Sequence, residues 1–141
     1  MGETGCGKTS LIEMAYKLLT KGTTKLKKMN IHAGISDDDI ISFMKKINDD
    51  VAREDSKILE NKKKEFNSLS EIDKKAYTRR NSISQIFKEY EKEISEREIW
   101  IFLDEINTCN SLGLITEILC KHSIYGKPLD KRYVFIAACN P

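Results

Sequence analysis

Apolar residues recur along the first part of the chain at the spacing of an amphipathic helix. This helical pattern starts at Lys8. Its apolar positions share one face: Leu11, Ile12, Ala15, Leu18 and Leu19. Glycine favours the left-handed turn that closes many helices, so we expect the first helix to end at Gly22.

Two later segments have the same helical spacing. The first begins at Ser36, whose side chain can cap a helix, and Asp residues follow it in the first turn. Its apolar stripe is Ile40, Phe43, Met44, Ile47 and Val51. The second covers residues 111–122, where Gly113 costs the helix about 1 kcal/mol relative to alanine. Its apolar positions are Leu112, Ile115, Ile118 and Leu119.

Three other segments are predicted to be strands. Residues 29–33 alternate between apolar and polar side chains, which favours a short strand that Gly34 ends. Residues 99–103 and 133–138 are continuous apolar runs, as expected of strands buried on both faces, and residues 126–128 favour a turn before the last one. Strands that alternate with helices predict an α/β domain with a mostly parallel sheet.

The composition changes between residues 52 and 97, where Lys, Glu, Asp, Asn and Ser dominate and apolar residues are thinly spaced. We interpret this segment as a charged helical insertion in one domain that covers residues 1–141. Charge runs usually keep long exposed helices in solution, and they serve less often as contact surfaces. Both uses stay open for this insertion.

Overall charge and apolar content argue against several classes of protein. The 24 Lys and Arg nearly balance the 22 Asp and Glu, and a net charge of +2 provides no strong field for nucleic acid or an anionic membrane. The apolar runs are too short to span a bilayer. We expect a soluble cytoplasmic protein, or alternatively a nuclear one, with no membrane partner and no clear nucleic-acid partner.

The four cysteines have no CxxC spacing, which argues against a zinc site and a disulfide framework. We expect reduced thiols, with Cys109, Cys120 and Cys139 as small buried hydrophobic side chains. His32 and His122 stand alone in the sequence, and we predict structural rather than catalytic roles for both.

The strongest chemical signal lies at the start of the chain. Residues 2–9 match the pattern GxxxxGK[ST] at every fixed position, and the first predicted helix follows directly. Backbone N–H groups of such a loop surround phosphate oxygens, while Lys8 would neutralise the β and γ phosphates and the Thr9 hydroxyl would bind Mg²⁺. The predicted nucleotide-binding residues are Gly2, Glu3, Thr4, Gly5, Cys6, Gly7, Lys8, Thr9 and Ser10.

A second signal is the acidic pair Asp104 and Glu105, which ends the apolar run 99–103 in the manner of a Walker B strand. Ligands bind at the C-terminal edge of a parallel sheet, where this strand would place both carboxylates. Asp104 is predicted to hold Mg²⁺, mainly through water, and Glu105 to orient and deprotonate the attacking water. An acidic pair that merely begins a loop is the alternative, which the phosphate-binding loop makes weaker.

Two asparagines lie near these signals. Asn140 follows the last predicted strand, where its amide could hydrogen-bond both the lytic water and a γ-phosphate oxygen. We predict this sensor role, against the alternative of a turn residue before Pro141. Asn107 could restrain the Glu105 carboxylate or cap a helix, and both interpretations stay open.

With both motifs and the strand that ends in Asn140, the chain resembles the AAA+ superfamily of P-loop ATPases over nearly its whole length, the charged insertion excepted. The resemblance implies a three-layer α/β/α core with strand order 5-1-4-3-2. Relative to that core we expect the chain to lack the first and last strands, the arginine-finger region and the helical lid. It also implies neighbouring AAA+ modules, in the same or another chain, that supply an arginine finger.

Within this superfamily the chain resembles the mysterin-type giant RING-finger AAA+ E3 ubiquitin ligases. The segments that carry the resemblance are residues 2–9, 32–34, 104–108, 117–122 and 136–141. The resemblance implies tandem ATPase modules in a very large protein, a protein substrate and a separate ligase module. The zinc-binding cysteine pattern of the ligase is absent from this sequence, so we assign no ubiquitin transfer to it.

The leading hypothesis is binding of ATP and Mg²⁺ and hydrolysis of the ATP within a larger AAA+ protein. The catalytic residues would be Lys8, Glu105 and Asn140, and the metal residues Thr9 and Asp104. We expect the isolated chain to be weak or inactive as an ATPase, because it supplies no identifiable arginine finger. The alternatives are a nucleotide-binding structural module without turnover and a nucleic-acid-associated P-loop motor.

Overall fold

The computed structural model describes residues 7–20, 26–79 and 81–139 of the chain. Contacts divide the chain into two compact units. The first unit consists of Met1–Lys46 and Glu98–Pro141, and the second of Ile47–Arg97. The first unit contains the strands, whereas the second is helical and overlaps the charged segment between residues 52 and 97.

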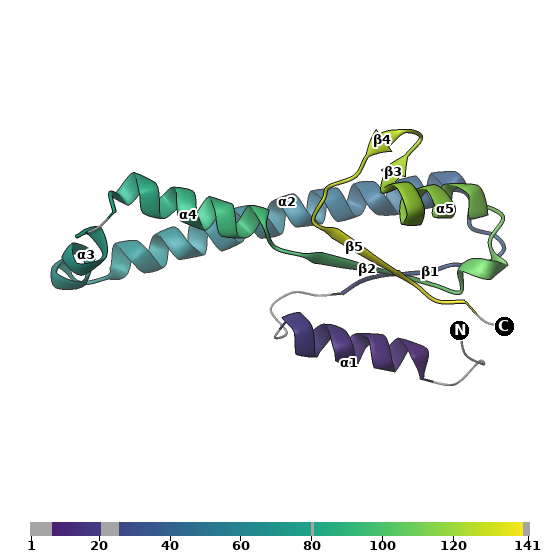
Figure 1. Ribbon diagram of the computed structural model, residues 1–141, viewed down its shortest axis with the longest axis horizontal. Helices are drawn as coiled ribbons and strands as arrows, with labels where there is room; N and C mark the ends of the chain where they lie inside the picture. Colours follow the sequence, from purple (N-terminus) through teal and green to yellow (C-terminus); the bar gives the residue numbers. More distant parts are fainter. Residues whose placement is uncertain (1–6, 21–25, 80, 140–141) are drawn as a thin grey trace. The chain divides into compact units, whose positions relative to one another are not determined.

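Helices and strands alternate through the first unit, and helices alone make up the second (Figure 1). In chain order the elements are α1 (Lys8–Thr20), β1 (Lys27–Asn30), α2 (Asp37–Ser68), α3 (Glu71–Thr78), α4 (Ile83–Ser95), β2 (Ile99–Asp104), the short 3₁₀ helix η1 (Ile106–Thr108), α5 (Leu112–Lys121), β3 (Ser123–Ile124), β4 (Lys127–Pro128) and β5 (Tyr133–Ala137).

A parallel sheet of three strands, in the order β1-β2-β5, organises the first unit. Asn30 pairs with Asp104, and Leu103 pairs with Ala137, so the carboxyl ends of all three strands meet at one edge. This order matches the run 2-3-4 within the strand order 5-1-4-3-2 that the resemblance implies. The predicted α/β class with a mostly parallel sheet is therefore confirmed.

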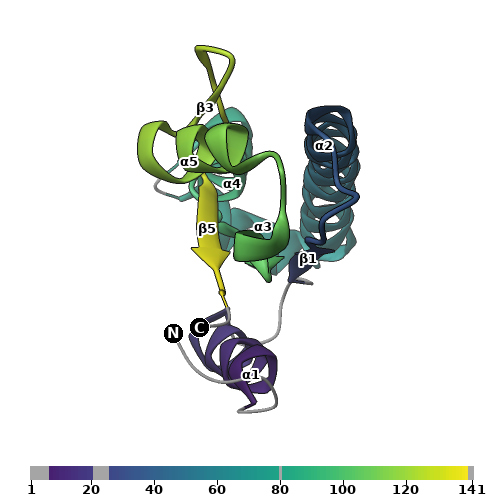
Figure 2. The same cartoon turned by 90° about the vertical axis from the view of Figure 1, so that its right-hand side faces the viewer.

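Helices cover both faces of this sheet within the first unit, with α1 on one face and α5 on the other (Figure 2). Side chains alternate across a strand, so β2 presents Trp100 to one face and Ile101 to the other. The Trp100 ring lies 5.7 Å from the Tyr16 ring of α1, measured between centroids. The opposite face is also apolar, and its buried residues from β2 and α5 include Ile99, Ile101, Leu103, Leu114, Ile115 and Ile118.

The side of α1 that packs on the sheet is not its most apolar stripe. Leu11, Leu18 and Leu19 are 64%, 73% and 69% exposed, whereas Tyr16 is 3% exposed. Thr9 and Tyr16 lie two helical turns apart and share the sheet-facing side. Periodicity predicted the helix correctly, but the Trp100 ring decides which side is buried. Gly22, expected to end the helix, lies outside the described residues.

The second predicted helix begins where expected and continues much further. Ser36 and Asp39 form reciprocal cap hydrogen bonds, because the Asp39 carboxylate accepts from the Ser36 N–H and the Asp39 N–H donates to Ser36 Oγ. The hydrogen bond from the Ser36 backbone N–H lowers the pKa of Asp39 most, and the hydrogen bond from the Ser36 hydroxyl lowers it further. The predicted N-terminus is confirmed, and α2 runs on through residue 68 into the charged segment.

Two predicted elements need correction. The strand expected over residues 29–33 is Lys27–Asn30, and Ile31 adds one backbone hydrogen bond to Asp104 before the chain turns. Apolar alternation extended past the strand because Ile31 is buried in the core without being part of the strand. The turn expected over residues 126–128 is centred on Tyr125 and Gly126, both with positive φ, so the following two residues form β4.

Around α5, the structure supports some side-chain predictions and overturns others. Cys109 is buried as predicted, but Cys120 is exposed and Cys139 is half-buried, so the buried interpretation was wrong for these two. Cys120 lies on the solvent side of an amphipathic helix, which burial of Ile118 orients. His122 ends α5 with positive φ, and its Nε2 lies 2.9 Å from the Asp130 carbonyl oxygen, which is a structural role.

The second unit has its own aromatic cluster. Phe66 is buried, and its ring makes edge contacts with Tyr77 at 6.3 Å and Phe87 at 5.7 Å between centroids. Ser82 caps α4 through a capping box with Gln85, which explains why the chain re-enters a helix there. In the described part of the chain, none of the helices combines the length and apolar character needed to cross a membrane.

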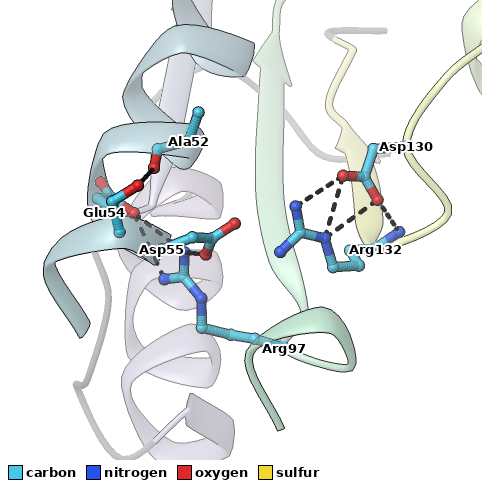
Figure 3. A network of polar contacts seen from close by, with 7 residues as sticks. Ala52, Glu54, Asp55, Arg97, Asp130 and Arg132 are labelled. Carbon is cyan, nitrogen blue, oxygen red and sulfur yellow. Dashed lines mark hydrogen bonds and ion pairs between the residues drawn. The ribbon is translucent and has the colours of Figure 1, made fainter. Parts of the chain in front are cut away.

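An arginine at the end of this unit holds two carboxylates of α2 (Figure 3). Arg97 Nη2 lies 2.8 Å from Asp55 Oδ1 and 3.4 Å from Glu54 Oε2. The Arg97 side chain is 16% exposed and that of Asp55 is 19% exposed, so water screens this pair only in part. The contact ties the segment that follows α4 back to the middle of α2.

Replacing Arg97 with Ala is expected to lower the free energy of unfolding by about 1–3 kcal/mol, between the values for exposed and buried ion pairs. The loss arises because two adjacent carboxylates would lose their shared cation. Thermal unfolding followed by far-UV circular dichroism measures it. Arg53→Ala is the matched control, since the Arg53 side chain is 75% exposed beside Asp50. Equal unfolding temperatures for the two variants would contradict the prediction.

Candidate functional site

The end of β2 and the start of α1 meet at the carboxyl edge of the sheet. Thr9 Oγ1 donates a hydrogen bond of 3.0 Å to Asp104 Oδ2. At the other end of the same two elements, Tyr16 contacts Trp100. These two contacts show that α1 is antiparallel to β2, so the first turn of α1 lies at the C-terminal end of the strand. Residues 95 positions apart in the chain thus become neighbours.

The turn that leads into α1 depends on Gly7. Its φ of +70° is a left-handed conformation that residues with a side chain rarely adopt, and its carbonyl accepts the Leu11 N–H at 2.9 Å. Lys8, the next residue, extends to the end of β5, where Nζ lies 3.4 Å from the Cys139 carbonyl oxygen. This places the lysine ammonium at the same sheet edge as Asp104.

A cavity of about 300 Å³ lies beside Lys8. Its lining residues come from the first turns of α1 and the end of β5: Lys8, Leu11, Ile12, Ala137, Ala138 and Cys139. Lys8 is the one charged residue in this lining, and the other five side chains are apolar or weakly polar. The cavity therefore adds room for a ligand next to the Lys8 ammonium.

Glu105 follows β2 in a strained backbone conformation. Its φ of 61° and ψ of 38° are left-handed, which is uncommon for a residue other than glycine and costs on the order of 1 kcal/mol. The Thr108 N–H and hydroxyl both donate to the Glu105 carbonyl oxygen. Ile106, which follows Glu105, donates its N–H to the Ala138 carbonyl oxygen at 3.0 Å. These bonds hold the turn so that Glu105 is exposed at the sheet edge.

A lysine that the sequence did not single out also reaches this edge. Lys28 Nζ of β1 lies 3.5 Å from Asp104 Oδ2, and 5.5 Å from the centre of the Phe102 ring. Neither motif contains Lys28, and its neighbour Lys27 looks equivalent in the sequence. Only the pairing register of β1 with β2 could have identified it.

The structure thus brings together Lys8, Thr9, Asp104 and Glu105 of the predicted site. Ser10 and Asn107 are exposed, and η1 occupies the segment around Asn107. The remaining predicted binding and catalytic residues lie outside the described part of the chain. They are Gly2, Glu3, Thr4, Gly5, Cys6 and Asn140.

The residues present fit Mg²⁺ as a partner of a nucleotide. Thr9 and Asp104 place a hydroxyl and a carboxylate oxygen 3.0 Å apart, and both are hard oxygen donors. Mg²⁺ keeps several waters and is usually bound through one or two carboxylates plus substrate phosphates. Among the described residues there is no group of three or more His, Cys, Asp or Glu side chains that could hold a metal ion.

Comparison with known proteins identifies the family of the chain. A family model described as an AAA domain of the dynein-related subfamily matches residues 1–120. Similar curated proteins include three E3 ubiquitin-protein ligases: RNF213 of Homo sapiens, 30% identical over 145 residues, rnf213-beta of Danio rerio, 27% identical over 145 residues, and RNF213 of Mus musculus, 30% identical over 146 residues.

Each of these matches covers 100% of this chain and 2% of the relative. The chain therefore spans a very small part of the length of these relatives. The resemblance to mysterin-type ligases is confirmed, since RNF213 is such a protein. The family match covers both the GKT loop at residues 2–9 and the strand that ends in Asp104. The chain therefore belongs to the AAA domain family, in its dynein-related subfamily.

Proposed function

We propose that the chain binds ATP together with Mg²⁺ and hydrolyses the ATP as one module of a larger AAA+ protein. The observation that carries the proposal is the hydrogen bond of 3.0 Å between Thr9 Oγ1 and Asp104 Oδ2. It joins the hydroxyl of a GKT loop to the first carboxylate of an acidic pair, although the two lie far apart in sequence. A mere glycine-rich turn would not require this contact.

Each residue has a distinct task in the proposed reaction. Lys8 binds the β and γ phosphate oxygens through its ammonium, and the backbone N–H groups at the start of α1 contribute further positive potential. Thr9 and Asp104 hold Mg²⁺, which when bound supplies positive charge to the phosphate oxygens. These residues bind and orient the triphosphate without taking part in proton transfer.

Glu105 is the proposed general base. Its carboxylate would accept a proton from the attacking water, whose oxygen forms a bond to the γ-phosphorus while the bond to the β–γ bridging oxygen breaks. The proton thus moves to Glu105, and the electron pair leaves with ADP. Exposure of Glu105 at the sheet edge supports this role, because the side chain can reach a water molecule. We keep Asn140 as the proposed sensor of the γ-phosphate.

The proposal extends to the setting of the module. The relatives are E3 ubiquitin-protein ligases of which the chain matches 2%, so we infer that nucleotide turnover here would serve a much larger protein with a protein substrate. Neighbouring AAA+ modules would supply the arginine finger. A cytoplasmic location stays part of this proposal.

Thr9→Ala tests the proposed site directly. Loss of the hydroxyl is expected to remove most of the Mg²⁺ dependence of ATP binding, about a tenfold loss of affinity in Mg²⁺, because one oxygen donor disappears. Titration with a fluorescent ATP analogue, in Mg²⁺ and in a chelator, measures both affinities.

Thr20→Ala is the matched control for this titration. Thr20 lies at the other end of α1, where its hydroxyl donates to the Tyr16 carbonyl oxygen at 2.7 Å. The control should keep the affinity of the original chain in both conditions. The proposal fails if the original chain binds the analogue equally well with Mg²⁺ and with chelator, or if the two variants behave alike.

A further inference from the structure

The Asp104 carboxylate has two partners on the same oxygen atom. Oδ2 accepts a hydrogen bond from Thr9 Oγ1 at 3.0 Å and lies 3.5 Å from Lys28 Nζ. The Asp104 side chain is 16% exposed, so little water competes for it. The oxygen proposed to hold the metal is therefore already in contact with a cation of the protein.

The position of Lys28 follows from the strand register. Lys28 pairs with Phe102 and Asn30 pairs with Asp104, so Lys28 lies two residues before the end of β1. From there its side chain extends over the Phe102 ring, 5.5 Å from Nζ to the ring centre, toward the carboxylate. The ring supports the aliphatic stem and attracts the ammonium. Lys27, one residue earlier, has its side chain on the opposite face of the strand.

We propose that Lys28 is a positioning residue that occupies the Asp104 carboxylate until a metal–nucleotide complex replaces it. This inference rests on the proposed function. An ammonium 3.5 Å from the carboxylate oxygen repels a divalent cation and competes for the same lone pairs. A triphosphate brings its own negative charge, which attracts the metal and compensates for that repulsion. Lys28 therefore makes metal binding depend on the nucleotide.

A structural ion pair that only joins β1 to β2 would behave differently. Removing such a pair would lower stability, and it would change the affinity for a metal ion no more than the removal of Lys27 does. In contrast, if Lys28 occupies the Asp104 carboxylate in place of the metal, which we call the placeholder role, removing the Lys28 charge should strengthen metal binding in the absence of nucleotide. A gain of affinity is not expected from general damage to the fold.

The experiment measures Mn²⁺ binding to the chain by electron paramagnetic resonance of the free ion, with and without ATP. Without ATP, Lys28→Met is expected to bind Mn²⁺ about fivefold more tightly, the factor that corresponds to an ion pair near the surface. With ATP present the difference should shrink, because the phosphates then dominate the charge around the metal. Methionine keeps much of the apolar stem over Phe102 while it removes the charge.

Two controls separate the contact from the overall charge. Lys27→Met removes one positive charge from the same strand on the other face, and it should bind Mn²⁺ like the original chain. Lys28→Arg keeps the cation and should also match the original chain. Circular dichroism checks folding, and Lys28→Gln replaces Lys28→Met if the latter fails to fold.

The possible outcomes are distinct. Tighter Mn²⁺ binding by Lys28→Met alone supports the placeholder role. Equal affinities for Lys28→Met and Lys27→Met, in a chain that binds ATP with Mn²⁺, overturn this inference and leave the proposed function intact. Absence of Mn²⁺-dependent ATP binding in the original chain overturns both.

Discussion

Replacing Lys8 with Ala is expected to weaken ATP binding by about a hundredfold. The side chain is the cation of the proposed phosphate-binding loop, and hydrogen bonds to charged groups contribute up to about 3 kcal/mol each, which corresponds to a factor of more than 100. Lys8 Nζ lies just beyond the end of β5, 3.4 Å from the Cys139 carbonyl oxygen, and Lys8 lines the cavity of about 300 Å³. Its loss leaves that cavity with apolar walls and without its cation.

Isothermal titration calorimetry with ATP and Mg²⁺ measures this effect. Lys17→Ala is the matched control, because Lys17 is an exposed lysine in the last turn of the same helix. Both variants lose one positive charge, so the overall charge of the chain changes alike. The prediction is wrong if Lys8→Ala retains an affinity within threefold or so of the Lys17→Ala value, which weak surface electrostatics alone could explain.

Glu105→Gln is expected to slow ATP hydrolysis by about 10²–10⁴-fold while ATP affinity stays nearly unchanged. Glutamine has the shape of glutamate but cannot accept the proton from the attacking water. The substitution does not relieve the left-handed backbone of this position, where φ is 61°, so folding stability should also stay nearly constant. Loss of turnover without loss of binding or stability identifies a chemical role.

Single-turnover hydrolysis of radiolabelled ATP, with protein in excess, is the appropriate measurement, carried out with the larger protein or with neighbouring modules that supply an arginine finger. Glu13→Gln is the control, since Glu13 is an exposed glutamate of α1. Equal rates for Glu105→Gln and the control would refute the role of general base. An original chain that binds ATP in this assembly without any turnover would instead favour a structural nucleotide-binding module.

Local chemistry made several features predictable. The helix at Lys8, the cap at Ser36 and the strand that ends in Asp104 depend on residues close together in sequence, and the structure confirms each of them. The ends of strands were less predictable where a residue is buried but does not pair with a neighbouring strand. Ile31 is buried like a strand residue but lies beyond β1. Tyr125 adopts a positive φ that its side chain does not favour, because the hairpin between β3 and β4 requires it.

The sequence by itself determined where the GKT loop and the strand that ends in the acidic pair lie, because such motifs are short-range patterns of backbone conformation and side-chain chemistry. It also determined that the sheet is mostly parallel, since strands alternate with helices. The tertiary structure alone decided that Thr9 and Lys28 both contact the Asp104 carboxylate. Lys27 and Lys28 are equivalent in the sequence, and only the register of β1 on β2 brings one of them to Asp104. Register is a long-range property, set by how whole strands and helices pack.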